Sequence, residues 1–148
     1  MTSSAAGPTG PAVVYLEQKL TGQILAAYYA VFQRLRGRTG YSEPNLVAAL
    51  AVELQARGLR VATEVVVPRR YRGRRIGADR LDLLVEERVP VEVKKVARLT
   101  QQHEAQLRTY LLDLGRPVGL LVNFGAAQPE VRRVYERRCD PTAGGVGA

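Results

Sequence analysis

The chain has 148 residues, a length at which one domain with a single modest core is expected. Hydrophobic residues make up 46% and charged residues 24%, which excludes a wholly disordered chain. With 22 basic and 14 acidic residues the net charge is +8, which favours a polyanionic partner such as nucleic acid.

The two ends of the chain predict disordered tails, because residues 1–12 and 139–148 are small and rich in Gly and Pro. The domain is therefore expected over 13–138. The N-terminal segment lacks the basic start and apolar run of a secretory signal, and no stretch is long enough to cross a bilayer. Cys139 is the only cysteine, which excludes an internal disulfide framework and a CxxC zinc site. We expect a cytoplasmic protein with no membrane contact.

Two helices are predicted before any strand. Apolar residues at three- and four-residue steps predict a long amphipathic helix over about 13–36, which ends near Gly37. A second helix over about 43–57 tolerates Pro44 in its first turn and is followed by Gly58.

The rest of the chain predicts a sheet. Short runs rich in valine and leucine predict strands at 59–67, 81–85, 89–96, 117–124 and, as a weaker edge element, 131–135. A basic hairpin is expected around 71–74, and a third helix runs from its N-cap Thr100 to Leu114. This order predicts an α/β fold, with a mixed β-sheet flanked by helices in a single domain.

Two acids and a lysine on adjacent strands form a candidate catalytic site. If 86–88 is the loop between these strands, Asp82 stands opposite Glu92, where like charges are destabilising unless a cation offsets them. Lys94 shares the face of Glu92, because side chains alternate along a strand. Carboxylate oxygens suit Mg²⁺ or Mn²⁺, and the lysine could orient or help to deprotonate a metal-bound water that hydrolyses a phosphodiester.

The same spacing also fits a solvated edge strand, and the sequence leaves this alternative open. Lys94 is nevertheless one of only three lysines in an arginine-rich chain. Arginine stays charged and cannot replace lysine in a proton transfer, which favours the catalytic interpretation.

Further polar residues are predicted to face this region. Gln106 lies beside the apolar stripe of the third helix, where it could bind the metal's water or a phosphate oxygen or simply be a satisfied polar group at the core rim. For His103 and Tyr110 the second interpretation is preferred. Glu43 lies on the face of Leu46 and points inward, although an acid in the first turn of a helix is equally well explained by the helix dipole.

A cluster of arginines predicts a contact with phosphates that does not read sequence. The cluster surrounds Tyr71 and Gly73 and consists of Arg69, Arg70, Arg72, Arg74 and Arg75. The alternative is an exposed hairpin that charge keeps soluble.

Taken together, these residues resemble the GxxExxR family of the PD-(D/E)XK nuclease superfamily over about 20–135. The segments that carry the resemblance are Leu20–Ile24, Gly40–Glu43, Arg80–Val85, Val91–Lys94, His103–Leu111 and Gly119–Gly125. The sequence departs from the family at Leu46, where tyrosine or arginine is frequent, and at Leu81, which replaces the proline of the superfamily's name.

The resemblance implies a restriction-endonuclease-like core in which Asp82 and Glu92 hold the catalytic metal and Lys94 serves the attacking water. Glu43 would supply an additional acid and would be a further metal ligand. Gln106 would begin a QxxxY element that ends at Tyr110. Tyr110 and the five arginines are the candidate nucleic-acid contacts.

We therefore expect a Mg²⁺-dependent endodeoxyribonuclease, in which Mn²⁺ can substitute and a metal-activated water attacks the DNA phosphodiester in line. The first alternative is a catalytically silent nucleic-acid-binding module of the same fold in a larger DNA repair or defence complex. A protein-interaction subunit of such a complex is the second. A homodimer is compatible with every one of these hypotheses.

Overall fold

Two amphipathic helices open the part of the chain that this computed structural model describes, residues 16–143. Helix α1 spans Gln18–Leu35 and helix α2 spans Glu43–Ala56. Helix α2 begins at a capping box, in which the Ser42 side chain accepts a hydrogen bond from Asn45 N and the Asn45 side chain accepts one from Ser42 N. Both predicted helices are confirmed, except that the predicted start of the first lies outside the described residues.

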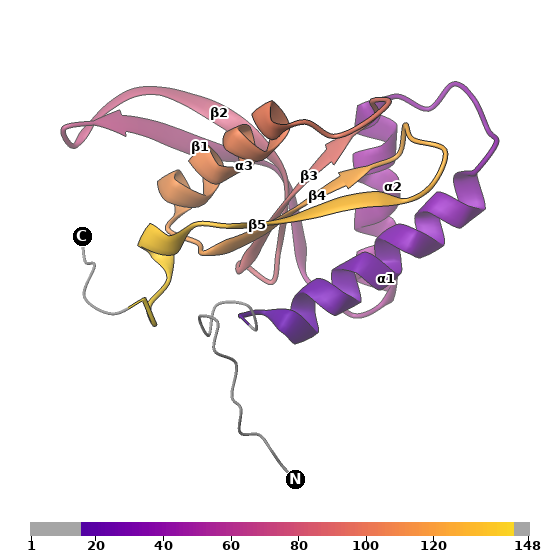
Figure 1. Cartoon of the computed structure of the whole chain (residues 1–148), viewed down its shortest axis with the longest axis horizontal. Helices are drawn as coiled ribbons and strands as arrows, with labels where there is room; N and C mark the ends of the chain where they lie inside the picture. The colour runs from indigo at the N-terminus through magenta and orange to yellow at the C-terminus, as the bar shows by residue number, and fades with distance from the viewer. Residues whose placement is uncertain (1–15, 144–148) are drawn as a thin grey trace, which may run out of the picture.

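The remaining elements form a five-stranded mixed sheet in the order β1-β2-β3-β4-β5 (Figure 1). The strands are β1 (Val61–Tyr71), β2 (Arg74–Val85), β3 (Val89–Lys94), β4 (Val118–Asn123) and β5 (Glu130–Tyr135). Strands β3 and β4 are parallel and are connected through helix α3 (Gln101–Leu114), whereas all other neighbours are antiparallel. The predicted mixed sheet flanked by helices is confirmed.

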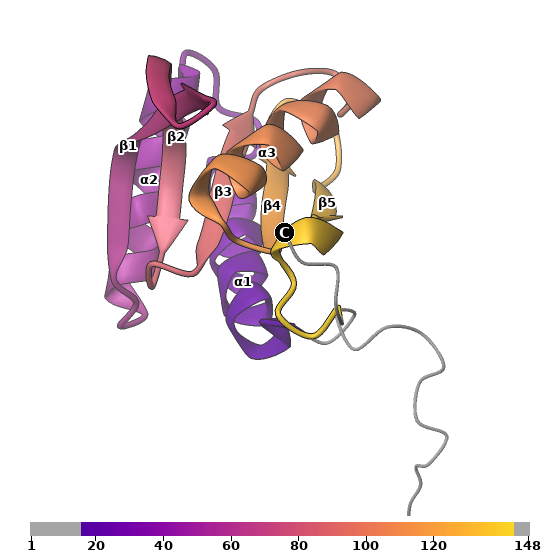
Figure 2. The same ribbon diagram turned by 90° about the vertical axis from the view of Figure 1, so that its left-hand side faces the viewer.

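The helices cover the two faces of the sheet unequally. Helices α1 and α2 lie on one face and α3 lies on the other (Figure 2). Strands β3 and β4 in the centre are buried almost throughout, which explains their nearly continuous apolar sequence. Val91 and Val93 belong to the core under α1 and α2, so Glu92 between them faces α3.

The register of the β2–β3 hairpin agrees with the prediction. Leu83 pairs with Val91 and Val85 pairs with Val89, and residues 86–88 form the connecting turn. This register directs Asp82 and Glu92 toward each other just beyond the last paired residues.

The predicted basic hairpin is confirmed, and its two strands are longer than the strands that the sequence predicts. Pairing extends to Tyr71 and Arg74, with a register shift between Arg69 and Arg70. The two-residue turn has positive φ at both Arg72 (51°) and Gly73 (80°), the geometry of a tight hairpin turn in which glycine is favoured. Backbone pairing holds this exposed ribbon together where no core does, and it projects beyond the helices at the left of Figure 1.

The folded part continues past residue 138, where the sequence predicted the start of a tail. A short 3-10 helix, η3, spans Arg137–Cys139, and the Tyr135 hydroxyl donates to Asp140 Oδ2 at 2.9 Å. The predicted N-terminal tail and residues 144–148 lie outside the described residues. None of the helices between residues 16 and 143 has the length and hydrophobicity needed to cross a bilayer.

Candidate active site

Asp82 and Glu92 meet where the regular β2–β3 ladder stops. The backbone N–H of Asp82 donates to Glu92 Oε2 at 3.0 Å, and the backbone N–H of Val93 donates to Asp82 Oδ2 at 2.8 Å. Each carboxylate therefore takes the place of a backbone acceptor on the opposite strand. The two acids that the sequence placed opposite each other do lie together.

Burial makes this pair electrostatically costly. Glu92 is only 4% exposed. Burial, and to a smaller extent the negative charge of Asp82, raises the pKa of Glu92 to about 8. Burial also raises the pKa of Asp82, against the hydrogen bond from Val93 and the positive charge of Lys94, which lower it. Two adjacent carboxylates whose ionised forms are both disfavoured by burial are a favourable place for a cation.

The oxygens left over at this pair fit a divalent metal. Neither Glu92 Oε1 nor Asp82 Oδ1 accepts a hydrogen bond from any residue between 16 and 143. A buried acceptor without a partner is costly, and Mg²⁺ satisfies such carboxylate oxygens while keeping several of its waters. Two carboxylates are sufficient for Mg²⁺, which is commonly bound by one or two acids together with substrate phosphates.

Lys94 and Gln106 form a second pair beside the acids. Lys94 ends β3, and its Nζ donates to Gln106 Oε1 on α3 at 3.1 Å. The charge of Lys94 lowers the pKa of both Asp82 and Glu92, in each case opposing the effect of burial. The structure thus brings Lys94 and Gln106, which were predicted separately, into one contact next to the carboxylates.

Glu43 faces inward, as predicted, and lies near the same region. Its Oε2 accepts a hydrogen bond from the backbone N–H of Lys95 at 2.8 Å, which ties the first turn of α2 to the end of β3. No three His, Cys, Asp or Glu side chains in the described part of the chain gather closely enough to hold a metal. Glu43 therefore does not complete a cluster with Asp82 and Glu92 in this structure, and its role as a metal ligand stays a prediction.

A cleft of about 230 Å³ connects Glu43 with Asp82 and also contains Glu64, which the sequence analysis missed. Glu64 is exposed, has a positive φ of 50°, and lies 3.3 Å from the Arg80 guanidinium. Its negative charge raises the pKa of Asp82. The sequence feature that could have identified Glu64 is that it is a single acid inside the mostly apolar run 61–67.

Asn123 is a second missed residue, and it positions the chain that follows Lys94. It is fully buried at the end of β4 and pairs with Lys94 in the parallel register. Its Oδ1 accepts from Val96 N (3.0 Å) and Gly125 N (2.9 Å), while its Nδ2 donates to Val96 O (2.8 Å). Gly125 is required here, because a Cβ would lie 2.5 Å from Val96 N. An amide in an otherwise apolar strand was the available signal.

His103 and Tyr110 have structural roles. The ring Nδ1 of His103 accepts from Thr100 N and its backbone N–H donates to Thr100 Oγ1, so His103 completes the cap of α3. Tyr110 is 1% exposed, and its hydroxyl donates to Arg80 O at 2.8 Å, which secures β2 two residues before Asp82. Tyr110 is therefore not accessible to nucleic acid, contrary to the prediction.

The arginines of the hairpin separate into one inward residue and four exposed ones. Arg69 contacts Asp79 (2.9 Å) and Asp113 (3.7 Å) and lies over the Tyr110 ring at 5.5 Å, so it is used within the protein rather than for nucleic acid. The exposed residues form no ion pair within residues 16–143, and we call them the arm arginines: Arg70, Arg72, Arg74 and Arg75. Tyr71 and Ile76 beside them are 65% and 70% exposed. The arm is a charged surface with apolar side chains at its tip.

Comparisons with known proteins agree with the fold. Residues 18–134 match the family model of the PD-(D/E)XK nuclease superfamily. The fold is similar to the crystal structure of SSO0001, with a TM-score of 0.52 and 20% sequence identity. That similarity covers 84% of this chain but spans only 60% of the other protein. No curated protein matches the sequence significantly.

Proposed function

Since the match covers most of its length, the chain belongs to the PD-(D/E)XK nuclease superfamily, and from this membership we propose that it is a metal-dependent nuclease. The observation that carries the proposal is the Asp82–Glu92 pair, whose unpartnered oxygens lie beside the Lys94–Gln106 contact. Within the superfamily we assign it to the GxxExxR family, on the segments around Glu43, Asp82 and Glu92. The substrate is DNA, cut within the strand.

Asp82 and Glu92 are the residues that would hold Mg²⁺, with Mn²⁺ as a substitute. The bound cation supplies charge neutralisation at the phosphate and acidifies a water. Ionising both acids without a cation is unfavourable, because burial raises both pKa values and the charge of Asp82 further raises that of Glu92. A bound cation therefore favours the ionised, reactive form of the site.

Lys94 would orient the attacking water, since Gln106 engages only one of the three N–H bonds of its ammonium group. In hydrolysis the water oxygen bonds to phosphorus, the bond from phosphorus to the leaving sugar oxygen breaks, and one proton of the water is released. Gln106 is a positioning residue, because it acts through Lys94. Glu43 also positions, by holding the backbone of Lys95 at 2.8 Å.

The arm arginines would hold the DNA backbone. Four exposed guanidinium groups without carboxylate partners among residues 16–143 are free to contact phosphates, which fixes the position of a duplex without reading its sequence. The two-stranded ribbon is also narrow enough to enter a major groove.

The test is cleavage of supercoiled plasmid and of branched DNA with Mg²⁺, Mn²⁺ or EDTA. We expect nicking that requires the metal and is lost in Asp82→Asn and in Lys94→Ala. Glu53→Gln is the matched control, because it neutralises an acid that pairs only with Arg57 on the surface of α2. Cleavage that survives both site substitutions would contradict the proposal.

The alternative of a silent nucleic-acid-binding module is favoured by one observation, the arm arginines, which can bind DNA without any chemistry at the carboxylates. It predicts salt-sensitive binding with no product under any metal. A stable homodimer, which light scattering would detect, is compatible with both functions.

A further inference from the structure

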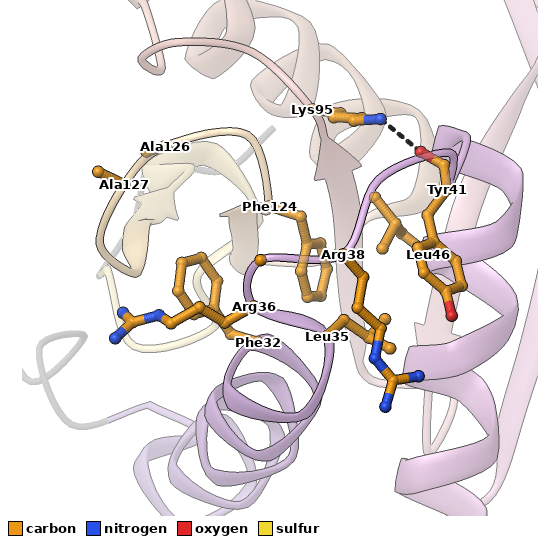
Figure 3. Close-up of a pocket in the computed structure, with 11 residues that line it drawn as sticks. Phe32, Leu35, Arg36, Arg38, Tyr41, Leu46, Lys95, Phe124, Ala126 and Ala127 are labelled. Atoms are coloured by element: carbon orange, nitrogen blue, oxygen red, sulfur yellow. Dashed lines mark hydrogen bonds between the residues drawn. The ribbon is translucent and has the colours of Figure 1, made fainter.

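A second concave site lies on the α1 side of the sheet, where the α1–α2 connection crosses the ends of β3 and β4. It is a cavity of about 200 Å³, which we call the α1 cavity (Figure 3). Its lining combines three aromatic rings with three cations, namely Phe32, Tyr41, Phe124, Arg36, Arg38 and Lys95. No acidic residue among residues 16–143 lines it. This composition selects an anionic ligand with a flat apolar part.

The aromatic wall is held rigidly by the core. Phe32 is buried, and its ring is nearly parallel to that of Phe124, at a centroid distance of 6.3 Å and an angle of 19°. Tyr28 packs against Phe124 at 5.0 Å from the interior side. Phe32 is 5% exposed and lies under Arg36, so it supports Phe124, whose half-buried ring is the surface on which a nucleobase of any sequence can stack.

The cations at the rim keep hydrogen-bonding capacity for a ligand. The Arg36 guanidinium lies over the Phe32 ring at 5.1 Å, with one hydrogen bond to Gln128 at 3.1 Å. Arg38 is exposed and forms no ion pair or side-chain hydrogen bond with any residue from 16 to 143. Lys95 Nζ donates once, to Tyr41 O at 2.6 Å, which leaves two N–H bonds (Figure 3). The Arg38 guanidinium and Lys95 Nζ point to opposite sides of the cavity, so each can bind a separate phosphate of one strand (Figure 3).

The end of β3 joins this cavity to the carboxylate site. Lys95 lines the cavity and directly follows Lys94, whose side chain contacts Gln106. The Lys95 backbone is held by Glu43, which also lines the cleft of Asp82. A nucleic-acid strand that reaches the carboxylates can therefore place a neighbouring nucleotide in the α1 cavity.

We propose that the α1 cavity binds one unpaired nucleotide of the substrate strand, with its base against Phe124 and the two phosphates that flank it on Arg38 and Lys95. The proposal rests on the proposed nuclease function and adds a preference for DNA with a single-stranded part.

The experiment compares binding of a blunt duplex with that of the same duplex carrying a short single-stranded tail, in EDTA so that nothing is cleaved. A 2-aminopurine in the tail reports stacking by a change in fluorescence. We expect the protein to bind the tailed duplex about tenfold more tightly, which corresponds to the stacking of a single base. Arg38→Ala and Lys95→Gln should each reduce this preference severalfold, and Arg38→Lys should restore part of it.

The matched control is Arg34→Ala, which removes the same charge from the exposed last turn of α1 but lies outside the cavity lining. It should weaken both duplexes slightly and equally. The proposal is overturned if the unaltered protein binds both duplexes equally. It is also overturned if both cavity variants keep the preference for the tailed duplex. If metal-dependent cleavage persists in that case, only this proposal fails and the nuclease function stands. A protein that binds and cleaves no DNA contradicts both.

Discussion

The centre of the sheet and the β1–β2 arm use charged residues in opposite ways. In the centre, Asp82 and Glu92 are withdrawn from water, each accepts a backbone hydrogen bond, and burial raises the pKa of both. In the arm, four arginines remain in water on a ribbon that only backbone pairing supports. A buried acid is costly to ionise, so its pKa shifts and it can take part in catalysis. A charged side chain that stays in water is available to contact a ligand. We therefore propose that the centre carries catalysis and that the arm binds the substrate.

The largest expected difference between the two regions is in the turnover rate. Asp82→Asn keeps the shape of the site but removes a ligand charge, and a loss of several kcal/mol at the metal corresponds to roughly a 10³-fold lower kcat. Arg72→Gln in the arm should leave kcat within a fewfold and raise KM. Steady-state cleavage kinetics separate the two effects. Equal losses of kcat in both variants would contradict the division of roles.

Glu92 makes the stability of the centre depend on pH. Its pKa is raised from the ordinary 4.5 to about 8, so the folded state binds a proton between these values that the unfolded state has released. The free energy of unfolding, measured in EDTA, should therefore be highest below about pH 4.5 for this group and fall as the pH rises toward 8, by an amount on the order of a few kcal/mol.

Glu92→Gln should remove this dependence and raise the melting temperature at pH 8, because the amide never ionises. Added Mg²⁺ should stabilise the unaltered protein more at pH 8 than at pH 5, since metal ligands must be deprotonated. The variant should not respond to the metal. Urea unfolding at several pH values measures both effects. If the free energy of unfolding of the variant depends on pH as it does in the unaltered protein, Glu92 is not the cause of that dependence.

The arm should control the salt dependence of binding. Replacing Arg70, Arg72, Arg74 and Arg75 by glutamine is expected to reduce the slope of log K against log salt by about 0.9 for each phosphate that the protein no longer neutralises. Arg69→Gln is the matched control, because Arg69 pairs with Asp79 and Asp113 and should affect stability instead. Fluorescence anisotropy at a series of salt concentrations tests this, and an equal change of slope in Arg69→Gln would place that residue on the DNA after all.

The smallest expected effect concerns Gln106, which touches Lys94 rather than the reacting atoms. Gln106→Ala should lower kcat about tenfold, within the range known for residues that orient a site, and shift the pH profile of cleavage. Gln106→Glu should restore the acceptor for Lys94 and part of the rate. Identical pH profiles for the unaltered protein and Gln106→Ala would indicate that Gln106 only packs at the surface.

Much of the fold follows from local patterns. Helical periodicity predicts the three helices, and the three-residue loop between β2 and β3 sets the register that places Asp82 near Glu92. The hairpin of the arm is predicted, but the length of its strands is not, because their pairing depends on backbone hydrogen bonds and not on apolar side chains. The positive φ of Glu64 likewise has no signal in the sequence.

By itself, the sequence determined the α/β class, the pairing of the two acids and the position of Lys94, since these depend on neighbours close along the chain and on alternation within a strand. Only the tertiary structure decided that Glu43 binds the backbone of Lys95, that Tyr110 is buried with its hydroxyl on the Arg80 carbonyl and that the rings of Phe32 and Phe124 stack. Those contacts join elements far apart in sequence. They depend on how whole helices pack against the two faces of the sheet, which local hydrophobic patterns do not specify.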